Sequence, residues 1–132
     1  MDRRQFLLVV GSGLCGCAAT VAYQGRLEQG RVLVPLAELP AEFSEKGYAL
    51  VRAAGLDDPI LIHRTGTGEF RALSARCTHL GCQVRPARNA LICPCHGSSF
   101  SWEGEVLRGP AQKPLPRYLV AVKEEILEIT ID

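Results

Sequence analysis

Two short segments in the middle of the chain concentrate the residues that could bind a metal. Residues 77–82 read CTHLGC and residues 93–100 read CPCHGSSF. Together they hold four cysteines and two histidines, out of 6 cysteines and 3 histidines in the 132-residue chain. Thiolate and imidazole are the ligands that zinc and iron take from proteins. Cysteine and histidine gathered at such spacings therefore predict a metal centre.

Three interpretations of these six side chains compete. A structural zinc takes four ligands, so six candidates leave two unexplained, and the pairs here are Cys-x-His and Cys-x-x-His rather than the usual Cys-x-x-Cys. A framework of disulfides would use the cysteines and give the histidines no role. A two-iron cluster can instead take two thiolates on one iron and two imidazoles on the other.

The third interpretation accounts for all six side chains. Cys77 and Cys93 would bind one iron, and His79 and His96 would bind the other. One cysteine is then left over in each segment, and these two would pair as a disulfide that clamps the segments together, namely Cys82 with Cys95.

The elements that must position these segments are short strands. After Gly30, turn-forming residues separate short apolar or alternating runs, which are RVLVPL, YALVRA, PILIHR, EFRALS, ALIC, SSFS, EVL, YLVAV and EILEITI. This pattern is typical of an all-β antiparallel sandwich or barrel. Residues 37–47 have room for one helical turn, and Pro40 within them argues against a long helix. The prolines and glycines of residues 103–118 exclude a central strand and predict a long ordered loop.

With the motifs and the strand pattern in view, the sequence resembles the Rieske iron–sulfur proteins, most of all those of cytochrome bc-type quinol oxidoreductases. CTHLGC and CPCHGS look like the two cluster-binding boxes of that family, and the layout is similar over residues 31–132. The resemblance implies one 2Fe-2S cluster at the tip of a small subdomain of an antiparallel β fold. Residues 109–114 resemble the family's proline loop, in which Pro110 would cover the cluster from a third side.

The resemblance also implies roles for residues beside the ligands. Gly81 and Gly97 would let the backbone turn tightly next to the cluster. The hydroxyl of Ser98 would donate to a cluster sulfur, which stabilises the reduced cluster and raises its potential. Leu80 and Pro94 would shield the cluster from water.

One position departs from the family pattern. Quinol-oxidising members commonly carry a tyrosine two residues after the serine, whereas this chain has Phe100, which has no hydroxyl to donate to a ligand sulfur. We expect a midpoint potential below that of the tyrosine-bearing proteins and still far above that of an all-cysteine ferredoxin. His63 lies outside both motifs, and we expect it to be an ordinary surface or core residue.

The N-terminal residues have a different composition. Arg3 and Arg4 precede an uncharged stretch over residues 6–23, which is the pattern of an export signal. The paired arginines resemble the twin-arginine signal of bacteria. We therefore expect residues 1–23 to be a signal or a membrane anchor.

The fate of this segment is open from the sequence. It could stay as an anchor, be removed by cleavage, or be lipidated at Cys17 within the box-like LCGC. We expect residues 24–30 to form a linker and residues 31–132 to form the cluster-binding domain.

The expected function is electron transfer. A net charge of +1 without a basic patch gives no sign of nucleic-acid binding. The resemblance implies a one-electron subunit of a larger oxidoreductase, on the outer, periplasmic face of a bacterial cytoplasmic membrane. It would accept electrons from quinol beside a cytochrome b-type subunit and pass them to a c-type cytochrome. His79 and His96 would then be both ligands and proton acceptors.

Two other roles come from the same family. One is the small electron-transfer subunit of an exported molybdenum oxidase, such as an arsenite oxidase. The other is a stand-alone Rieske ferredoxin, as in aromatic-ring dioxygenases, although an export signal and a disulfide argue against a cytosolic protein.

Overall fold

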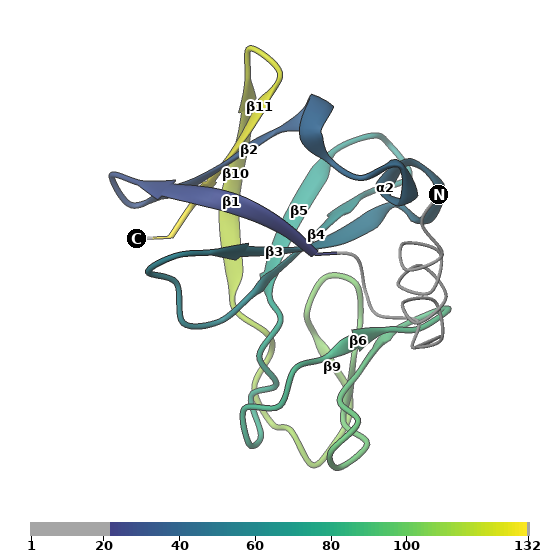
Figure 1. The fold of residues 1–132 in the computed structure, drawn as a ribbon. Helices are drawn as coiled ribbons and strands as arrows, with labels where there is room; N and C mark the ends of the chain where they lie inside the picture. The colour runs from purple at the N-terminus through teal and green to yellow at the C-terminus, as the bar shows by residue number, and fades with distance from the viewer. Residues whose placement is uncertain (1–21, 132) are drawn as a thin grey trace, which may run out of the picture.

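The computed structural model describes residues 22–131, and its upper part in Figure 1 is a closed barrel of seven strands. In chain order the barrel strands are β1 (Ala22–Glu28), β2 (Arg31–Pro35), β3 (Tyr48–Ala53), β4 (Ile60–Arg64), β5 (Phe70–Ser74), β10 (Arg117–Lys123) and β11 (Ile126–Thr130). Around the barrel they follow the order β1-β2-β11-β10-β5-β4-β3. The expected all-β fold is therefore present, with a barrel as its main layer.

Every neighbouring pair in the barrel is antiparallel except one. β1 pairs antiparallel with β2 and parallel with β3, so it closes the barrel between them. The parallel pair follows from the connection between β2 and β3, which contains the 3₁₀ turn η1 (Leu36–Glu38) and the helix α2 (Ala41–Lys46). This short helix agrees with the one helical turn expected after Pro40.

The structure corrects the predicted linker at residues 24–30. Ala22–Glu28 is a strand whose residues 22–25 pair with β3 and whose residues 26–28 pair with β2, so these residues belong to the barrel. The run AYQGRLE has few β-branched residues and a central glycine, which is why it does not read as a strand. A Cβ on Gly25 would lie 2.9 Å from Val32 Cγ1, so the glycine permits the close approach of β1 and β2.

The expected signal or anchor over residues 1–23 lies, with Cys17, almost wholly on residues 1–21, outside the described part of the chain, and its last two residues, Ala22 and Tyr23, belong to β1. Within residues 22–131, no helix is long and apolar enough to span a bilayer.

A second, smaller sheet lies below the barrel in Figure 1 and carries the two cysteine–histidine loops. Its strands, in both chain and spatial order, are β6 (Arg85–Pro86), β7 (Leu91–Ile92), β8 (Ser99–Phe100) and β9 (Val106–Arg108). β9 falls inside the expected loop over residues 103–118, but as an edge strand, where nearby prolines are tolerated. Residues 109–116 form the rest of that loop.

Two hydrophobic clusters share the strands β3, β4 and β5. Ile60 and Ile62 pack in the barrel core, while Leu61 between them packs in the second cluster, with the small sheet. β5 alternates in the same way between Ala72 and Leu73. Successive side chains of a strand point to opposite faces, so these strands are buried on both sides. The small sheet is therefore held on a rigid support.

Candidate metal centre

The two cysteine–histidine loops are built in the same way. In each loop the N–H of the first cysteine donates to the carbonyl five residues on, and its carbonyl accepts from the glycine four residues on. These bonds are Cys77 N to Cys82 O (2.7 Å), Gly81 N to Cys77 O (3.0 Å), Cys93 N to Ser98 O (2.8 Å) and Gly97 N to Cys93 O (3.0 Å). The repeated geometry places the first cysteine and the glycine of each loop in equivalent positions, whereas the histidine follows the cysteine by two residues in the first loop and by three in the second.

Glycine is needed at the turn of each loop. Gly81 has φ of 82° and Gly97 has φ of 80°, values that side chains with a Cβ rarely adopt. Both positions therefore agree with the tight turns expected from the sequence.

The first cysteines of the two loops are buried free thiols that lie next to each other. Cys77 and Cys93 are each 2% exposed, and neither is in a disulfide. Burial raises the pKa of the Cys77 thiol, and the neighbouring Cys93 thiol raises it further. The backbone N–H groups of His79 and Leu80 act in the opposite direction on this pKa, because they donate to the sulfur. A pair of buried thiols with amide donors aimed at one sulfur suits thiolate ligands of a metal.

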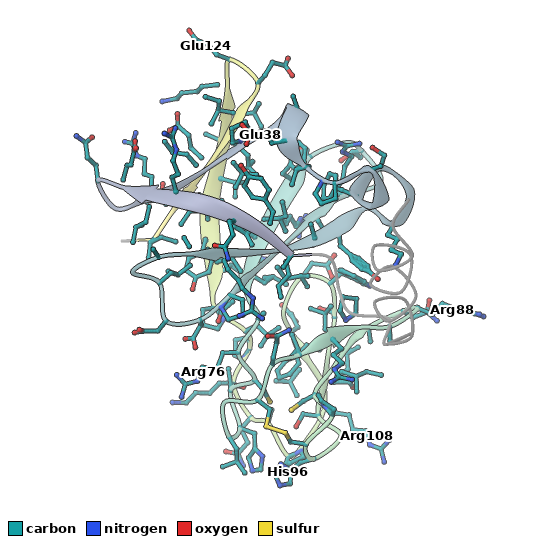
Figure 2. All side chains as sticks on the ribbon, in the orientation of Figure 1. Glu38, Arg76, Arg88, His96, Arg108 and Glu124 are labelled. Carbon is teal, nitrogen blue, oxygen red and sulfur yellow. A yellow bond between two sulfur atoms is a disulfide. The ribbon has the colours of Figure 1, made fainter. Side chains whose placement is uncertain are left out.

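The two histidines meet at the end of the molecule. Their ring centroids are 4.9 Å apart and the rings are perpendicular, at 88°. His96 is exposed and lies at the lower tip in Figure 2, whereas His79 is half-buried. The Nδ1 atom of His79 is buried without a hydrogen-bond partner. An unpaired buried ring nitrogen is costly, and a metal bond at Nδ1 would satisfy it.

Cys82 and Cys95 form a disulfide that joins the two loops, as expected. The sulfurs of Cys82, Cys93 and Cys95 all lie within 4.8 Å of one another. Sulfurs bonded to each other have no thiolate to offer a metal, so only Cys93 of the three is a suitable ligand. All six side chains of the two motifs are thus gathered at one tip, with Cys82 and Cys95 paired and Cys77 and Cys93 free.

The proline-rich loop covers the third side of this tip. Ser98 is fully buried, and its Oγ accepts a hydrogen bond of 3.0 Å from Ala111 N. Thr78 Oγ donates to Lys113 O at 2.7 Å. Each cysteine–histidine loop is therefore fastened to the loop over residues 109–116. A hollow of about 470 Å³ lies between them, lined by Thr78, His79, Pro110, Gln112 and Lys113.

The other expected neighbours divide by exposure. Phe100 is fully buried in the hydrophobic cluster that packs under the small sheet. Leu80 is 64% exposed, and Pro94 and Pro110 are exposed as well, so these three form part of the outer surface of the tip.

His63 lies away from the tip, at the seam between the barrel and the small sheet. It is 6% exposed, and its Nε2 lies 2.8 Å from Trp102 O, which requires the ring nitrogen to donate. Burial lowers the pKa of His63, so its neutral form is favoured. The expectation of an ordinary core histidine is confirmed.

The contacts of four residues at the tip were not predicted from the sequence. Arg76 and Thr78 flank Cys77, and this adjacency could have drawn attention to them. Ala111 and Lys113 lie within the expected proline loop over residues 109–114, but nothing in their local sequence indicates that they fasten it to the two cysteine–histidine loops.

The barrel, the small sheet and the paired Cys and His side chains define an iron–sulfur electron-transfer protein. Residues 35–119 match the Rieske [2Fe-2S] domain family. The chain therefore belongs to that family, and it carries one Rieske-type 2Fe-2S cluster.

The similar proteins of known sequence include iron-sulfur subunits of cytochrome b6-f complexes. The chain is 36% identical to the cytochrome b6-f complex iron-sulfur subunit of Chlorobaculum tepidum, over 98% of this chain and 76% of that protein. It is 32% identical to the cytochrome b6-f complex iron-sulfur subunit 2 of Nostoc, over 85% of this chain and 65% of the relative. Other relatives of this kind are covered over about half of their length or less.

Solved structures agree on the fold. The plasma membrane Rieske protein PetC3 from Synechocystis PCC 6803 is 32% identical, with a TM-score of 0.59, over 68% of this chain and 92% of that one. A complex of oxygenase and ferredoxin in carbazole 1,9a-dioxygenase gives a TM-score of 0.61 at 23% identity, which supports the fold alone.

Proposed function

We propose that this Rieske protein takes electrons from quinol and passes them to a c-type cytochrome, with Cys77 and Cys93 binding one iron and His79 and His96 the other. One observation carries the proposal. Two buried thiols and two histidines converge at one tip, with one ring nitrogen buried and unpaired and the other imidazole exposed. This division supports mixed ligation, in which the imidazole side of the centre faces a reaction partner.

Bound at this tip, a Rieske cluster accepts and releases one electron at a time. The chain's own contribution is at the imidazoles. The exposed His96 ring can accept a hydrogen bond from a quinol hydroxyl and keep the proton when the electron leaves the quinol. The buried thiols and the hydrophobic cluster around them keep water from the sulfur side.

The proposed partners rest on two observations, the names of the similar proteins and the open surface around His79. The two hollows that His79 lines are open to the surface, so a quinol pocket would have to be completed by another subunit. We propose a cytochrome b-type membrane subunit for this role, because cytochrome b6-f iron-sulfur subunits are among the similar proteins. The domain would stand on the outer face of a bacterial cytoplasmic membrane, carried there by the N-terminal segment.

Electron paramagnetic resonance of the reduced protein tests the ligand set. We expect the low average g value of mixed Cys and His ligation. A spectrum of an all-cysteine cluster, or no signal after iron and sulfide reconstitution, would refute it. A His96→Ala variant should lose the mixed-ligand signal, while His63→Ala, a histidine outside the motifs, should retain it.

Purification from the native membrane tests the partners. We expect haem b and haem c to co-purify with the chain. We also expect a quinol to reduce the protein when the haem-containing subunits are present. Molybdopterin in place of the haems would assign the chain to an exported molybdenum oxidase and overturn the quinol proposal.

A further inference from the structure

The formal charges of the protein are separated between its two parts. Residues 76–116, which form the cluster-binding part, contain five Arg or Lys residues and two Glu residues, a net charge of +3. The barrel segments, residues 22–75 and 117–132, contain eight basic and eleven acidic residues, a net charge of −3. The overall charge of +1 hides this separation. A charge separation of this kind orients a protein as it approaches a charged partner.

Three of the five cations stand around the histidine tip. Figure 2 shows Arg76 and Arg108 on opposite sides of His96, at the end of the molecule away from Glu124. Lys113 is exposed and lines the hollow that His79 also lines. Arg76 lines a second hollow of about 430 Å³, which His79 lines as well. We call Arg76, Arg108 and Lys113 the cationic rim.

Acidic side chains are scarce at this tip. Among the described residues that line the two hollows, the single acid is Asp58. Its carboxylate lies 3.6 Å from the Arg76 guanidinium, so that it is already paired. In the small sheet, Glu103 pairs with Arg71 of the barrel. The charges of Arg108 and Lys113 therefore remain uncompensated by any ion pair within residues 22–131.

Exposed apolar side chains accompany the residues of the rim. Leu80, next to His79 in the sequence, is 64% exposed, and Leu107, next to Arg108 in the sequence, is 59% exposed. Large apolar side chains exposed beside charged ones are common on surfaces that contact another protein.

We propose that the cationic rim docks an electron-carrier protein whose own docking face is acidic. The inference rests on the proposed electron transfer through the histidine tip and adds the charge of the partner. A protein carrier is favoured over a lipid surface because His96 lies within the rim, so whatever docks there contacts a ligand of the cluster and must be able to exchange electrons. The step transfers one electron from the reduced protein to the carrier, and no bond is made or broken.

The experiment uses a matched pair of acceptors. The full chain is reduced chemically and mixed in a stopped-flow instrument with cytochrome c, either native and lysine-rich or with its lysines succinylated and hence acidic. Each rate is corrected for the acceptor's own midpoint potential. We expect the acidic form to react at least tenfold faster at about 0.01 M salt, where the screening length is roughly 30 Å. At about 0.1 M salt the screening length is roughly 10 Å, and the difference between the two rates should shrink.

Charge-reversal variants identify the residues. The double variant Arg108→Glu with Lys113→Glu should lose the preference for the acidic acceptor, while its cluster spectrum is retained. The control is Arg26→Glu with Lys123→Glu, two exposed barrel residues outside the rim, which should leave the preference unchanged. Equal rates with the two acceptors, or equal effects of the two double variants, would overturn the inference.

Two further readouts separate the alternatives. A preparation without a mixed-ligand resonance signal would mean that the proposed function has failed, whatever the rates. Co-sedimentation with phosphatidylglycerol vesicles tests the lipid alternative. If vesicle binding is lost in the rim variant while its acceptor preference is unaltered, the rim is a membrane contact and the inference is wrong.

Discussion

The hydroxyl oxygen of Ser98 accepts a hydrogen bond of 3.0 Å from the backbone N–H of Ala111. This bond joins the second cysteine–histidine loop to the proline-rich loop in a place without solvent, since Ser98 is 0% exposed. Because the oxygen is the acceptor, the hydroxyl hydrogen is free to be donated elsewhere. One side chain can therefore hold the covering loop and stabilise negative charge on a cluster sulfur.

Replacing Ser98 by Ala should lower the midpoint potential, because the reduced cluster loses a donor that it needs more than the oxidised cluster does. A bond worth about 1 kcal/mol more to the reduced form corresponds to roughly 40 mV for one electron. Protein-film voltammetry measures the shift. Ser101→Ala is the control, since Ser101 Oγ accepts from Glu103 N and Glu105 N in a turn outside the two loops. Equal potentials in Ser98→Ala and the parent would remove Ser98 from the cluster's donors.

Phe100→Tyr should raise the midpoint potential. The Phe100 ring is fully buried in the hydrophobic cluster of the small sheet, which also contains Cys77 and Cys93. A hydroxyl added to this ring would therefore lie in a site of low dielectric constant near the proposed ligand sulfurs. We expect a rise of several tens of millivolts, on the order of 1 kcal/mol for one electron. Phe70→Tyr, in the barrel core, adds the same hydroxyl and should not change the potential. A Phe100→Tyr protein with the parent potential would refute the role of this position.

The four cysteines of the motifs should respond differently to substitution. Cys77→Ser removes a proposed thiolate ligand and should abolish the cluster, whereas Cys82→Ser removes half of the Cys82–Cys95 disulfide and should leave a cluster that assembles. Closing a loop of this length, 13 residues apart in sequence, stabilises a protein by roughly 3 kcal/mol. Iron content and the urea midpoint distinguish the two outcomes. If Cys82→Ser also failed to hold iron after reconstitution, the disulfide would be essential for the site.

The local sequence was sufficient to predict the disulfide and the turns of the two loops, but it predicted the barrel less well. The proposed ligands and the disulfide fall within two segments in which residue type and spacing limit the choices, and glycines mark the turns with positive φ at 81 and 97. β1 was missed because its stability comes from pairing with β2 and β3, which its own sequence does not reveal. The contacts that Ala111 and Lys113 make to Ser98 and Thr78 were not predicted for a similar reason, since they form only when distant segments meet.

The stability of the protein should fall as the pH drops below about 6.5, through His63. Burial is the main cause that lowers the pKa of this histidine, and the positive charge of Arg71 lowers it as well, while the Trp102 carbonyl and Glu103 act to raise it. The unfolded chain then binds more protons than the folded one between the lowered pKa and the ordinary value of about 6.5, so stability is present above that range and is lost below it. Urea unfolding at about pH 7.5 and about pH 5.5 measures this.

His63→Phe is the matched variant for the pH experiment. It keeps an aromatic ring beside Trp102, whose centroid lies 5.1 Å from that of His63, and removes the titrating group. We expect a smaller loss of stability between the two pH values than in the parent. Identical losses would show that carboxylates elsewhere cause the pH dependence.

Gly81→Ala should cost more stability at the tip than the same change at another glycine with positive φ. A Cβ on Gly81 would lie 2.9 Å from Arg76 Nε and 3.0 Å from its terminal nitrogen, so the guanidinium would be pushed off the loop and away from Asp58. Gly68 has a similar φ of 87°, with nothing within 4 Å of an added Cβ. Both variants carry the backbone cost of about 1–2 kcal/mol, and only Gly81→Ala adds the displacement of Arg76. Hydrogen exchange of the Cys77–Cys82 loop and the urea midpoint of both variants measure the difference. Equal midpoints, with unchanged exchange in this loop, would mean that the contact between Arg76 and Gly81 does not hold the loop in place.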